Sequence, residues 1–597
     1  MRLKQYSTAL ALERYLGDPA DAQNRFSFKR AVEYDEQEAY PKEVCKLLNQ
    51  WNLHHYYIPT SYGGKLTSYE EMLAIVRVIA RRDLTVAIAH GSTYLGSVGV
   101  WSGGSDKQKH KLAQIINRQK AVAFGLTEKA HGSDLLASSV CATKISNGYL
   151  LSGEKWLINN ATRSGAITVF ARSDARGGPR GFSLFLVEKE RLEQASYTHL
   201  PKVKTLGIRG ADISGIRFDN ALLPADSLIG KAGFGLEITL KSLQITRTLC
   251  AGLSLGAANT ALQTTLNFAL SRRVYGDTIF AIPQVRRTLV EAFLDLLICD
   301  CMAIAAARGL HVATNQFSVW SSIIKYFVPV TIENTIRDLS VVLGARYYLR
   351  EEHDWGVFQK VQRDNALVSL FDGNTAVNLY NIVLQLGSLY DGYSKLKSGD
   401  KQELNERLRS IFALENPPPA FNPQNLALFN HGRDDVLQGL ALSLSSLQTL
   451  QPESDFNTQV LREIIRLTSQ AMVEIKTQQA ILADLKKKYG RALNKSPELF
   501  ELAKNYCTLH AAAACIQIWI HNRTLLDEFF LKGEWLVLAL NRLMSTLSKN
   551  STVQAPSVHA YVENIAQELV KRYKEDQLFS IIPFQLQTNT KQLEGQS

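Results

Sequence analysis

The chain has 597 residues and a formal net charge of +11. This length predicts several structural units. The composition, 46% hydrophobic and 21% charged, is that of a folded globular protein and excludes a largely disordered chain. The basic excess favours anionic partners such as phosphorylated cofactors. However, no long block of Lys and Arg occurs, so the charge predicts no nucleic acid partner and gives no support to a membrane-surface contact.

The cysteine pattern argues against both a disulfide framework and a zinc site. The seven cysteines are scattered, odd in number and without CxxC spacing. The longest apolar stretch, Ala511–Ile520, is shorter than the roughly 20 residues that span a bilayer, and the N-terminus has no secretory pattern. We therefore expect a metal-free protein in a reducing, cytoplasmic compartment.

Residues 1–120 are predicted to form an N-terminal helical domain. Apolar residues recur at helical spacing over residues 70–80. Further on, Ser105 is a suitable N-cap for a helix over residues 107–116.

Residues 121–230 are predicted to form a small β-barrel-like domain. Short β-rich runs at residues 149–153, 166–171 and 181–187 alternate with Gly, Asn and Asp. The dipeptide Asn147-Gly148 is typical of a type I′ hairpin turn.

Helical periodicity returns in residues 231–395, over 249–270, 286–309 and 321–343. Long helices in succession predict a four-helix bundle.

The remaining residues are predicted to form a linker, a helical extension and a tail. Prolines mark residues 396–424 as the linker, and residues 425–585 are predicted to be the extension. In the extension, apolar residues at near-heptad spacing predict one long helix: Leu461, Ile465, Met472, Ile475 and Leu482. Because this part carries no catalytic motif, we expect it to serve assembly, partner docking or a membrane surface rather than chemistry. Residues 586–597 are predicted to be a disordered tail.

One stretch, from Gly125 to Asp134, combines an apolar run with a polar break. It contains Thr127, Glu128, Gly132 and Ser133, which would present backbone N–H groups and short donors to a ligand. An ordinary strand end followed by a turn would produce the same pattern.

The residue sequence of this stretch closely resembles the Thr-Glu-x-x-x-Gly-Ser-Asp motif of the acyl-CoA dehydrogenase family. Later landmarks agree with it in order, so the resemblance covers roughly residues 25–395. They are Thr205–Asp212, the Arg272-x-x-Tyr275-Gly276 motif with Gln284 beyond it, Gly344 and Arg363-Asp364.

The resemblance implies a mainly α fold with a central β-domain: a helical domain, a small β-domain and a four-helix bundle, here followed by the appended helices. It also implies FAD. Chemistry alone requires a flavin or a nicotinamide, because no side chain accepts a hydride well, and it is the resemblance that specifies FAD. The implied reaction is the oxidation of a Cα–Cβ bond in an acyl-CoA or other acyl thioester, within fatty acid metabolism.

The family's motifs assign the cofactor contacts residue by residue. The implied FAD-binding residues are Phe124, Leu126, Thr127, Ser133, Asn159, Arg272, Tyr275, Gln284, Gly344 and Asn374. Two motifs depart from the family. Where the family has Trp-Ile-Thr, this chain has Trp156-Leu-Ile-Asn159. The Trp is therefore shifted by one residue, and Asn159 stands at the Thr position. Its Gln-x-x-Gly-Gly keeps only Gly344.

The family's catalytic Glu is replaced by Asp372 in the sequence Leu370-Phe-Asp-Gly-Asn-Thr375. The alternative family position, on the helix of Arg247, holds Thr246, which leaves Asp372 as the only candidate base. Its side chain is one methylene shorter, and its ordinary pKa of about 3.9 must rise for this task. The resemblance also implies acyl-thioester contacts for Ser133, Arg247 and Gly373. For Arg247, a structural role is equally consistent with the sequence.

Several alternatives remain open at this point. The acyl carrier is CoA or an acyl-carrier protein. The enzyme is a dehydrogenase that passes electrons to an acceptor such as an electron-transfer flavoprotein, or it is an oxidase. Acyl-CoA oxidases share its length, and nitroalkane oxidases resemble the family and use Asp as the base. A non-catalytic binding or assembly protein would also retain the fold. The resemblance implies a homodimer or homotetramer, because Arg272 and Gln284 would reach the FAD of a neighbouring subunit.

Overall fold

Six helices precede the first strand in the computed structural model, which describes residues 3–394, 399–450, 458–547 and 556–588. They are α1 Ser7–Leu16, α2 Phe28–Glu36, α3 Lys42–Gln50, α4 Tyr69–Arg82, α5 Leu84–Gly103 and α6 Asp106–Asn117. The two helices predicted here are confirmed as α4 and α6. Ser105 is the N-cap of α6: it accepts the N–H of Gln108, whose side chain in turn accepts the N–H of Ser105.

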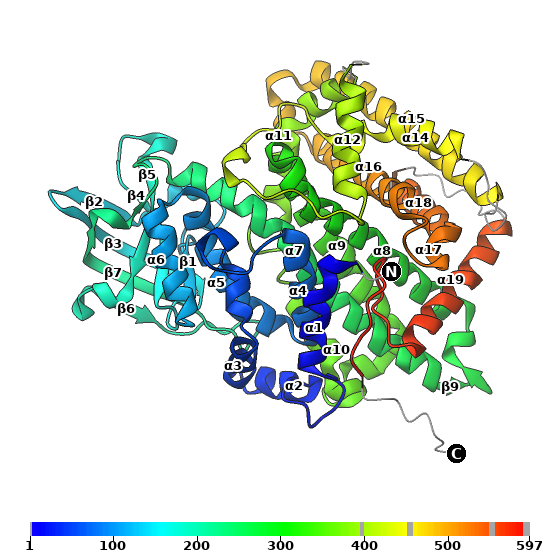
Figure 1. Cartoon of the computed structure of the whole chain (residues 1–597), viewed down its shortest axis with the longest axis horizontal. Helices are drawn as coiled ribbons and strands as arrows, with labels where there is room; N and C mark the ends of the chain where they lie inside the picture. Colours follow the sequence, from blue (N-terminus) through cyan, green and yellow to red (C-terminus); the bar gives the residue numbers. More distant parts are fainter. Residues whose placement is uncertain (1–2, 395–398, 451–457, 548–555, 589–597) are drawn as a thin grey trace.

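Eight strands form one sheet, which makes the lobe at the left of Figure 1. They are β1 Val122–Gly125, β2 Cys141–Ile145, β3 Gly148–Asn159, β4 Ala166–Arg172, β5 Phe182–Glu188, β6 Tyr197–Leu200, β7 Ile213–Pro224 and β8 Leu228–Ile229. Their order is β6-β7-β3-β2-β4-β5-β8, and β1 lies parallel to β4.

The predicted hairpin exists between β2 and β3, but its turn differs from the prediction. Ile145 pairs with Gly148, so Ser146 and Asn147 form the loop. Neither loop residue has a positive φ, whereas a type I′ turn requires positive φ at both central positions. The type I′ prediction was therefore wrong.

Helix α5 packs directly on β1, which joins the N-terminal helices to the sheet. A Cβ at Gly96 would lie 2.5 Å from the carbonyl oxygen of Val122, so only glycine permits this approach. The hydroxyl of Thr168 on β4 donates to the carbonyl of Gly96 at 2.6 Å.

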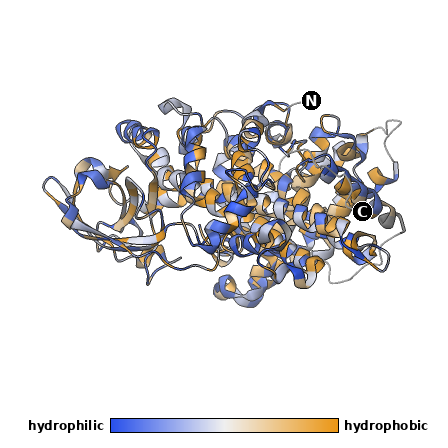
Figure 2. Cartoon of the chain, turned by 90° about the horizontal axis from the view of Figure 1, so that it is seen from below, coloured by the Kyte–Doolittle hydropathy of each residue, from blue (hydrophilic) through white to orange (hydrophobic). Residues whose placement is uncertain are grey.

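Long helices form the body of the molecule, where Figure 2 shows the hydrophobic stretches concentrated. The bundle consists of α7 Gly235–Ser271, α8 Pro283–Val312, α9 Phe317–Leu343 and α11 Thr375–Ser394, with α10 Glu352–Asn365 before α11. The three helices predicted in this region are confirmed as α7, α8 and α9. Between α7 and α8 the chain forms a small hairpin of β9 Arg273–Val274 and β10 Asp277–Thr278.

The extension begins earlier than predicted. Residues 396–424 were predicted to be a linker, but α12 Asp400–Phe412 lies within them. Leu404, Leu408 and Phe412 are buried and form the apolar face of this helix. The prolines further along the chain led to the prediction of a linker instead. The later helices are α13 Asp435–Gln438, α14 Leu440–Thr449, α15 Thr458–Tyr489, α16 Pro497–Asn522, α17 Glu528–Lys532, α18 Glu534–Leu547 and α19 Pro556–Lys574.

The long helix predicted in the extension is confirmed as α15, but two of the five predicted stripe residues are not buried. Ile465 and Met472 are only partly buried, whereas Ile464, Leu467 and Ala471 are buried. Leu461, Ile475 and Leu482 are buried as predicted, so the near-heptad prediction was right at three of its five positions.

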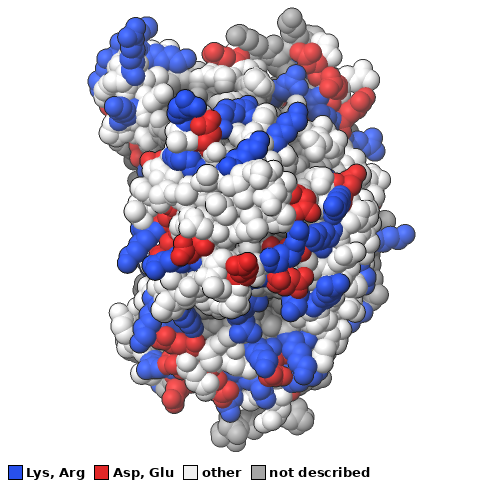
Figure 3. Space-filling model, turned by 90° about the vertical axis from the view of Figure 1, so that its left-hand side faces the viewer, with Lys and Arg blue, Asp and Glu red and all other residues white. Residues whose placement is uncertain are grey.

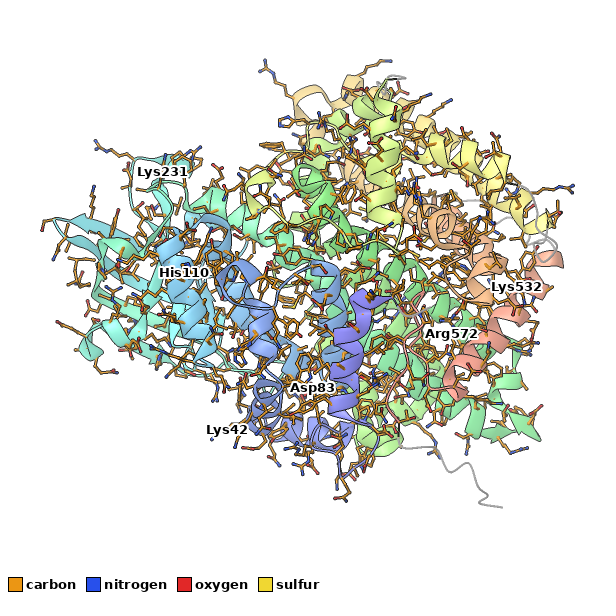
Figure 4. The ribbon with its side chains drawn as sticks, in the orientation of Figure 1. Lys42, Asp83, His110, Lys231, Lys532 and Arg572 are labelled. Atoms are coloured by element: carbon orange, nitrogen blue, oxygen red, sulfur yellow. The ribbon has the colours of Figure 1, made fainter. Side chains whose placement is uncertain are left out.

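The last described residues pack against the body, contrary to the predicted tail from residue 586. Leu586 is buried, and the N–H of Gln587 donates to Glu13 of α1 at 3.1 Å. This segment, red in Figure 1, runs beside α1. Arg572 of α19, labelled in Figure 4, donates to the carbonyl of Ser580 at 2.5 Å. Residues 589–597 lie outside the described residues.

The three units of the family-like region meet at a buried cluster of charges. Lys360 of α10 donates to Asp83 (Figure 4) at 2.6 Å and to Asp364 at 2.5 Å. Asp364 also accepts the N–H of Ile208, from the loop before β7, at 2.5 Å. The N-terminal helices, the sheet and the bundle are thus fixed relative to one another.

Candidate active site

The loop after β1 is held by its main-chain carbonyls. The carbonyl of Thr127 accepts the N–H of Trp156 at 3.0 Å, and the carbonyl of Leu126 accepts the ammonium of Lys155 at 3.0 Å. The side chains of Phe124, Leu126 and Thr127 are half-buried, and Ser133 is exposed. Four predicted cofactor residues therefore lie on one short segment, partly open to a ligand.

A buried ion pair between Glu128 and Lys155 anchors this loop. The two groups are 2.7 Å apart and almost fully enclosed. Burial raises the pKa of Glu128, but Lys155 and the hydrogen bonds from Ser139 outweigh it and bring the pKa to about 2. Burial lowers the pKa of Lys155 to about 8 despite Glu128. Sequence reasoning missed Lys155, although a lysine within a β-rich run was the available signal.

Strand β3 is irregular where it passes the loop. The register with β7 shifts between Trp156 and Ile158, and the intervening Leu157 has φ +57° and is 40% exposed. This conformation is rare for a bulky residue and marks a bulge that redirects side chains. Trp156 is half-buried rather than part of the core.

Asn159 lies just beyond this bulge, at the end of β3. Its Nδ2 donates to the carbonyl of Ile88 at 3.1 Å. Its Oδ1 is enclosed and accepts no hydrogen bond within the described residues. A buried acceptor without a partner is costly, so this atom marks a place for a ligand donor.

Asp372 lies in a tight turn between α10 and α11. Asp372 has φ +55° and Gly373 has φ +88°, so two successive residues are left-handed. The Nε of Arg247, on α7, donates to the carbonyl of Asp372 at 2.9 Å. A Cβ at Gly373 would lie 2.7 Å from the guanidinium of Arg247. Arg247 is buried and supports the turn through this hydrogen bond. Its contact with a ligand stays a prediction.

The carboxyl group of Asp372 faces α7. Cys250 donates its thiol to Oδ2 at 3.8 Å, and Oδ1 is enclosed without a hydrogen-bond partner within the described residues. Burial raises the pKa of Asp372 above its ordinary value, and the cations of Arg247 and Lys325 offset only part of that effect. The rise is in the direction that a general base requires near neutral pH.

Lys325 is a second functional candidate that sequence reasoning missed. It lies on α9, is fully buried and donates to the carbonyls of Val368 at 2.6 Å and Gly373 at 3.2 Å. Its ammonium lies 5.4 Å from the ring centroid of Phe371. A lone lysine within the apolar run Ser321–Val330 was the signal that could have identified it.

Two further predicted cofactor residues end or begin helices. The Oδ1 of Asn374 accepts the N–H of Val377 at 2.9 Å, at the start of α11. Gly344 is the C-cap of α9. Asn374 and Gly344 thus each have a structural role at a helix end. Their contact with FAD stays a prediction.

Arg272, Tyr275 and Gln284 are exposed and belong neither to the sheet nor to the turn of Asp372. Arg272 and Tyr275 belong to the β9–β10 hairpin region, at the lower right of Figure 1, whereas the sheet lies at the left. Tyr275 is 98% exposed. The chain therefore gathers two groups of predicted residues at different places. On the face shown in Figure 3, Lys and Arg are interspersed with Asp and Glu.

Three family models match consecutive parts of this chain. The N-terminal domain of acyl-CoA dehydrogenase matches residues 22–118, the middle domain matches residues 123–221 and the C-terminal domain matches residues 233–386. The chain belongs to the acyl-CoA dehydrogenase family, whose members are FAD-dependent oxidoreductases acting on CH–CH groups.

Individual relatives show how far the likeness extends. A probable acyl-CoA dehydrogenase, FadE25 of Mycobacterium tuberculosis, is 26% identical over 349 residues, which is 58% of this chain and 88% of the relative. An acyl-CoA dehydrogenase of Bacillus anthracis, solved with FAD, superposes with a TM-score of 0.70 at 18% identity over 96% of both chains. The prolyl acyl carrier protein oxidase AnaB has a TM-score of 0.57 at 19% identity, over 65% of this chain and 100% of its own. The full-length superposition shows that the predicted fold, including the extra helices, is correct.

The residues around Thr127 and Asn159 fit a flavin. The orphaned Oδ1 of Asn159 offers an acceptor to a ring N–H. Apolar Leu157, Leu206 and Leu370 are 40%, 71% and 61% exposed, and each offers apolar surface to a ligand. Within the described ranges, no group of three or more His, Cys, Asp or Glu side chains gathers as metal ligands. No helix in the described parts is long and apolar enough to cross a membrane.

Proposed function

We propose that this chain oxidises the Cα–Cβ bond of an acyl thioester to a 2,3-enoyl thioester, with Asp372 as the base. The observation that carries the proposal is the placement of this carboxylate. It lies in a left-handed turn and is enclosed, its pKa is raised, and one of its oxygens lacks a partner. A capping aspartate would accept a main-chain N–H of the helix that follows, whereas neither oxygen of Asp372 accepts a main-chain N–H within the described residues.

In the proposed reaction the Cα–H bond breaks and its proton passes to the carboxylate of Asp372. A hydride leaves Cβ, and the remaining electron pair forms the C=C bond. Bound FAD supplies the acceptor for that hydride. The main-chain N–H of Asp372 donates no hydrogen bond within the described residues, so it is available to the thioester carbonyl, where negative charge develops as the proton leaves.

The visible spectrum of the purified protein tests the proposal. We expect a flavin spectrum, release of FAD rather than FMN on heating, and anaerobic bleaching by at least one saturated acyl thioester. A panel should present each acyl group on CoA and on an acyl-carrier protein, since both carriers are compatible with the site. A FAD-loaded protein that no thioester bleaches would refute the proposed reaction.

An oxidase on the same scaffold is the second candidate, and Asp372 in place of Glu is the observation that favours it. The structural likeness to AnaB is consistent with this reading but concerns the fold alone. Rapid reoxidation of the bleached protein by oxygen, with hydrogen peroxide formed in equal amount, would establish the oxidase. Slow reoxidation would favour the dehydrogenase, with an electron-transfer flavoprotein as the acceptor.

We also propose that the active form is a homodimer or a dimer of dimers. Arg272, Tyr275 and Gln284 are exposed, and they belong to the β9–β10 hairpin and the start of α8 rather than to the sheet, so we infer that a FAD contact from them requires a second copy. The extension is proposed to stabilise the bundle and the assembly. It also contacts the bundle near the site: Gln244, one turn before Arg247, donates to the carbonyl of Ala427 at 2.8 Å.

A further inference from the structure

The hexapeptide Val368–Gly373 is clamped at both ends by one buried ammonium. Lys325 donates to the carbonyl of Val368 at 2.6 Å and to that of Gly373 at 3.2 Å. Asp372 lies between these two contacts. The carbonyl of Asp372 itself accepts the Nε of Arg247 at 2.9 Å. Two cations from two helices therefore fix the backbone of the proposed base.

Burying a lysine completely is expensive, and only its partners make it tolerable. Lys325 is fully buried, and burial lowers its pKa, while Cys250 and Asp372 act in the opposite direction. No carboxylate within the described residues forms a salt bridge with Lys325. A purely structural clamp could use neutral donors on two carbonyls, so a full positive charge at this place calls for a further explanation.

The charged and titratable groups that face Asp372 come from two helices. Arg247 and Cys250 lie on α7, and Lys325 lies on α9, while Thr246 adds a hydroxyl from α7. Both cations lower the pKa of Asp372 against the effect of burial. Without Lys325, one cation would remain to oppose the desolvation of the carboxylate.

We propose that Lys325 is a positioning residue for the base: its ammonium holds the turn of Asp372 in place and keeps the carboxylate ionised. This inference rests on the proposed function, because it gives Lys325 a task only if Asp372 takes a proton. It also explains how a side chain shorter than glutamate is kept in one orientation. A misplacement of about 1 Å can cost about 100-fold in rate.

Two substitutions separate the two parts of this role in the FAD-loaded protein. Lys325→Gln keeps an N–H donor for the carbonyls but removes the charge, and Lys325→Met removes both. The matched control is Trp320→Leu, on the same helix, because Trp320 is buried against Phe317 and His510 rather than against the turn. It should lower stability without changing Asp372.

The first readout is infrared titration of the Asp372 carboxyl group, as the difference from Asp372→Asn, which cancels the bands of FAD. We expect the absorption band of the protonated Asp372 carboxyl group to persist to higher pH in both Lys325 variants, by about one pH unit or more. The reason is that each variant removes a nearby opposite charge that favours the ionised carboxylate. Trp320→Leu should titrate as the wild type does. Unchanged titration in Lys325→Gln would overturn the proposal, and this readout needs no turnover.

The second readout is the pH dependence of flavin reduction by a thioester that bleaches the wild type. We expect the half-maximal rate to move to higher pH in Lys325→Gln, with about tenfold slower reduction at neutral pH. Lys325→Met should be slower still. If the wild type is not bleached by any thioester, the proposed function fails, while the infrared titration still decides the role of Lys325. If Lys325→Met does not fold, Lys325→Gln carries both measurements.

Discussion

Arg247 on α7 donates its Nε to the main-chain carbonyl of Asp372 at 2.9 Å, across 125 residues of sequence. The contact is to the backbone and leaves the carboxylate free. It gives the buried guanidinium of Arg247 a hydrogen-bond acceptor. The turn that carries Asp372 is thus supported by the helix against which its side chain lies.

Gly373→Ala should damage this support. Gly373 has φ +88°, which costs roughly 1–2 kcal/mol for a residue with a Cβ, and the new methyl group would meet the guanidinium of Arg247 at 2.7 Å. We expect the free energy of unfolding to fall by about 1–3 kcal/mol and flavin reduction to slow at least tenfold. Denaturant unfolding and stopped-flow reduction measure the two effects.

The control for this substitution is Gly399→Ala. Gly399 has a helical φ of −68°, and a Cβ there would meet nothing within 4 Å. Its substitution should change stability by less than about 0.5 kcal/mol, as for an ordinary surface change. Equal effects at Gly373 and Gly399 would contradict the role assigned to the turn.

The ion pair of Glu128 with Lys155 predicts how the cofactor loop responds to acid. The pKa of Glu128 falls from 4.5 to about 2 on folding. The native state therefore binds this proton more weakly than the unfolded state does. The stabilisation is present above pH 4.5 and is lost as the pH falls towards 2. Glu128→Gln should remove this contribution to acid sensitivity.

At neutral pH, Glu128→Gln should also cost about 3–5 kcal/mol, because it leaves the buried ammonium of Lys155 without its counter-charge. The matched control is Glu154→Gln on β3, the strand that carries Lys155. Glu154 pairs with Arg217 at 2.9 Å, but its side chain is only half-buried and that of Arg217 is exposed, so its loss should cost at most about 1 kcal/mol. Thermal unfolding at several pH values compares them, and a similar cost for both would argue against the anchoring role of Glu128.

The family-like part of the fold could be predicted because its motifs are local. The Thr127–Asp134 stretch and the helical periodicity of α7, α8 and α9 each lie within one short segment of sequence. The linker prediction failed because Pro417–Pro419 dominate the composition of residues 396–424, while the four apolar residues that dock α12 are spread thinly among charges. Periodicity in so polar a helix becomes visible only once its partner is known.

The supporting residues of the site could not be predicted in the same way. Lys155 and Lys325 act on carbonyls 29 and 43 or more residues away. Neither has a partner within its own segment that would mark it. A buried lysine differs from a surface lysine only through the packing around it. The raised pKa of Asp372 likewise follows from enclosure by α7.

Arg308 should be indispensable to the docking of the extension. It is fully buried, pairs with Glu70 at 2.7 Å and donates to the carbonyls of Ser410, Ile411, Ala413 and Asn416. Arg308→Met would leave these acceptors unpaired and Glu70 uncompensated. We expect a loss of about 3–5 kcal/mol, measured by denaturant unfolding.

Arg337→Met is the matched control for Arg308, because Arg337 lies at the surface, 67% exposed; it should be nearly neutral. Truncation near Pro417 should give an aggregating product, since it would remove α16 and uncover the face of α8 that packs against it. A soluble, FAD-binding truncated chain would show that the extension is dispensable for folding.

Arg272→Ala should weaken FAD retention and assembly together if the hairpin reaches a second copy. The side chain of Arg272 has no partner within the described part of the chain, so its removal should not lower the stability of a single chain. The neighbouring Arg273 is equally exposed, and Arg273→Ala is the control. Light scattering with flavin absorbance on the same sample measures both properties. A fully FAD-loaded, active monomer would contradict the assembly.

Asp372→Asn should separate binding from chemistry. The amide keeps the size of the side chain but cannot accept the α-proton, so FAD and thioester binding should persist. Flavin reduction should slow by about a thousandfold, within the 100- to 10,000-fold range of a general base. In the wild type, the rate should rise with pH through the raised pKa of Asp372, because only the ionised form is a base, and this rise should vanish in the variant. Asp391→Asn, on the exposed side of α11, is the control and should reduce its flavin as the wild type does. Reduction of Asp372→Asn at the wild-type rate would remove Asp372 from the reaction.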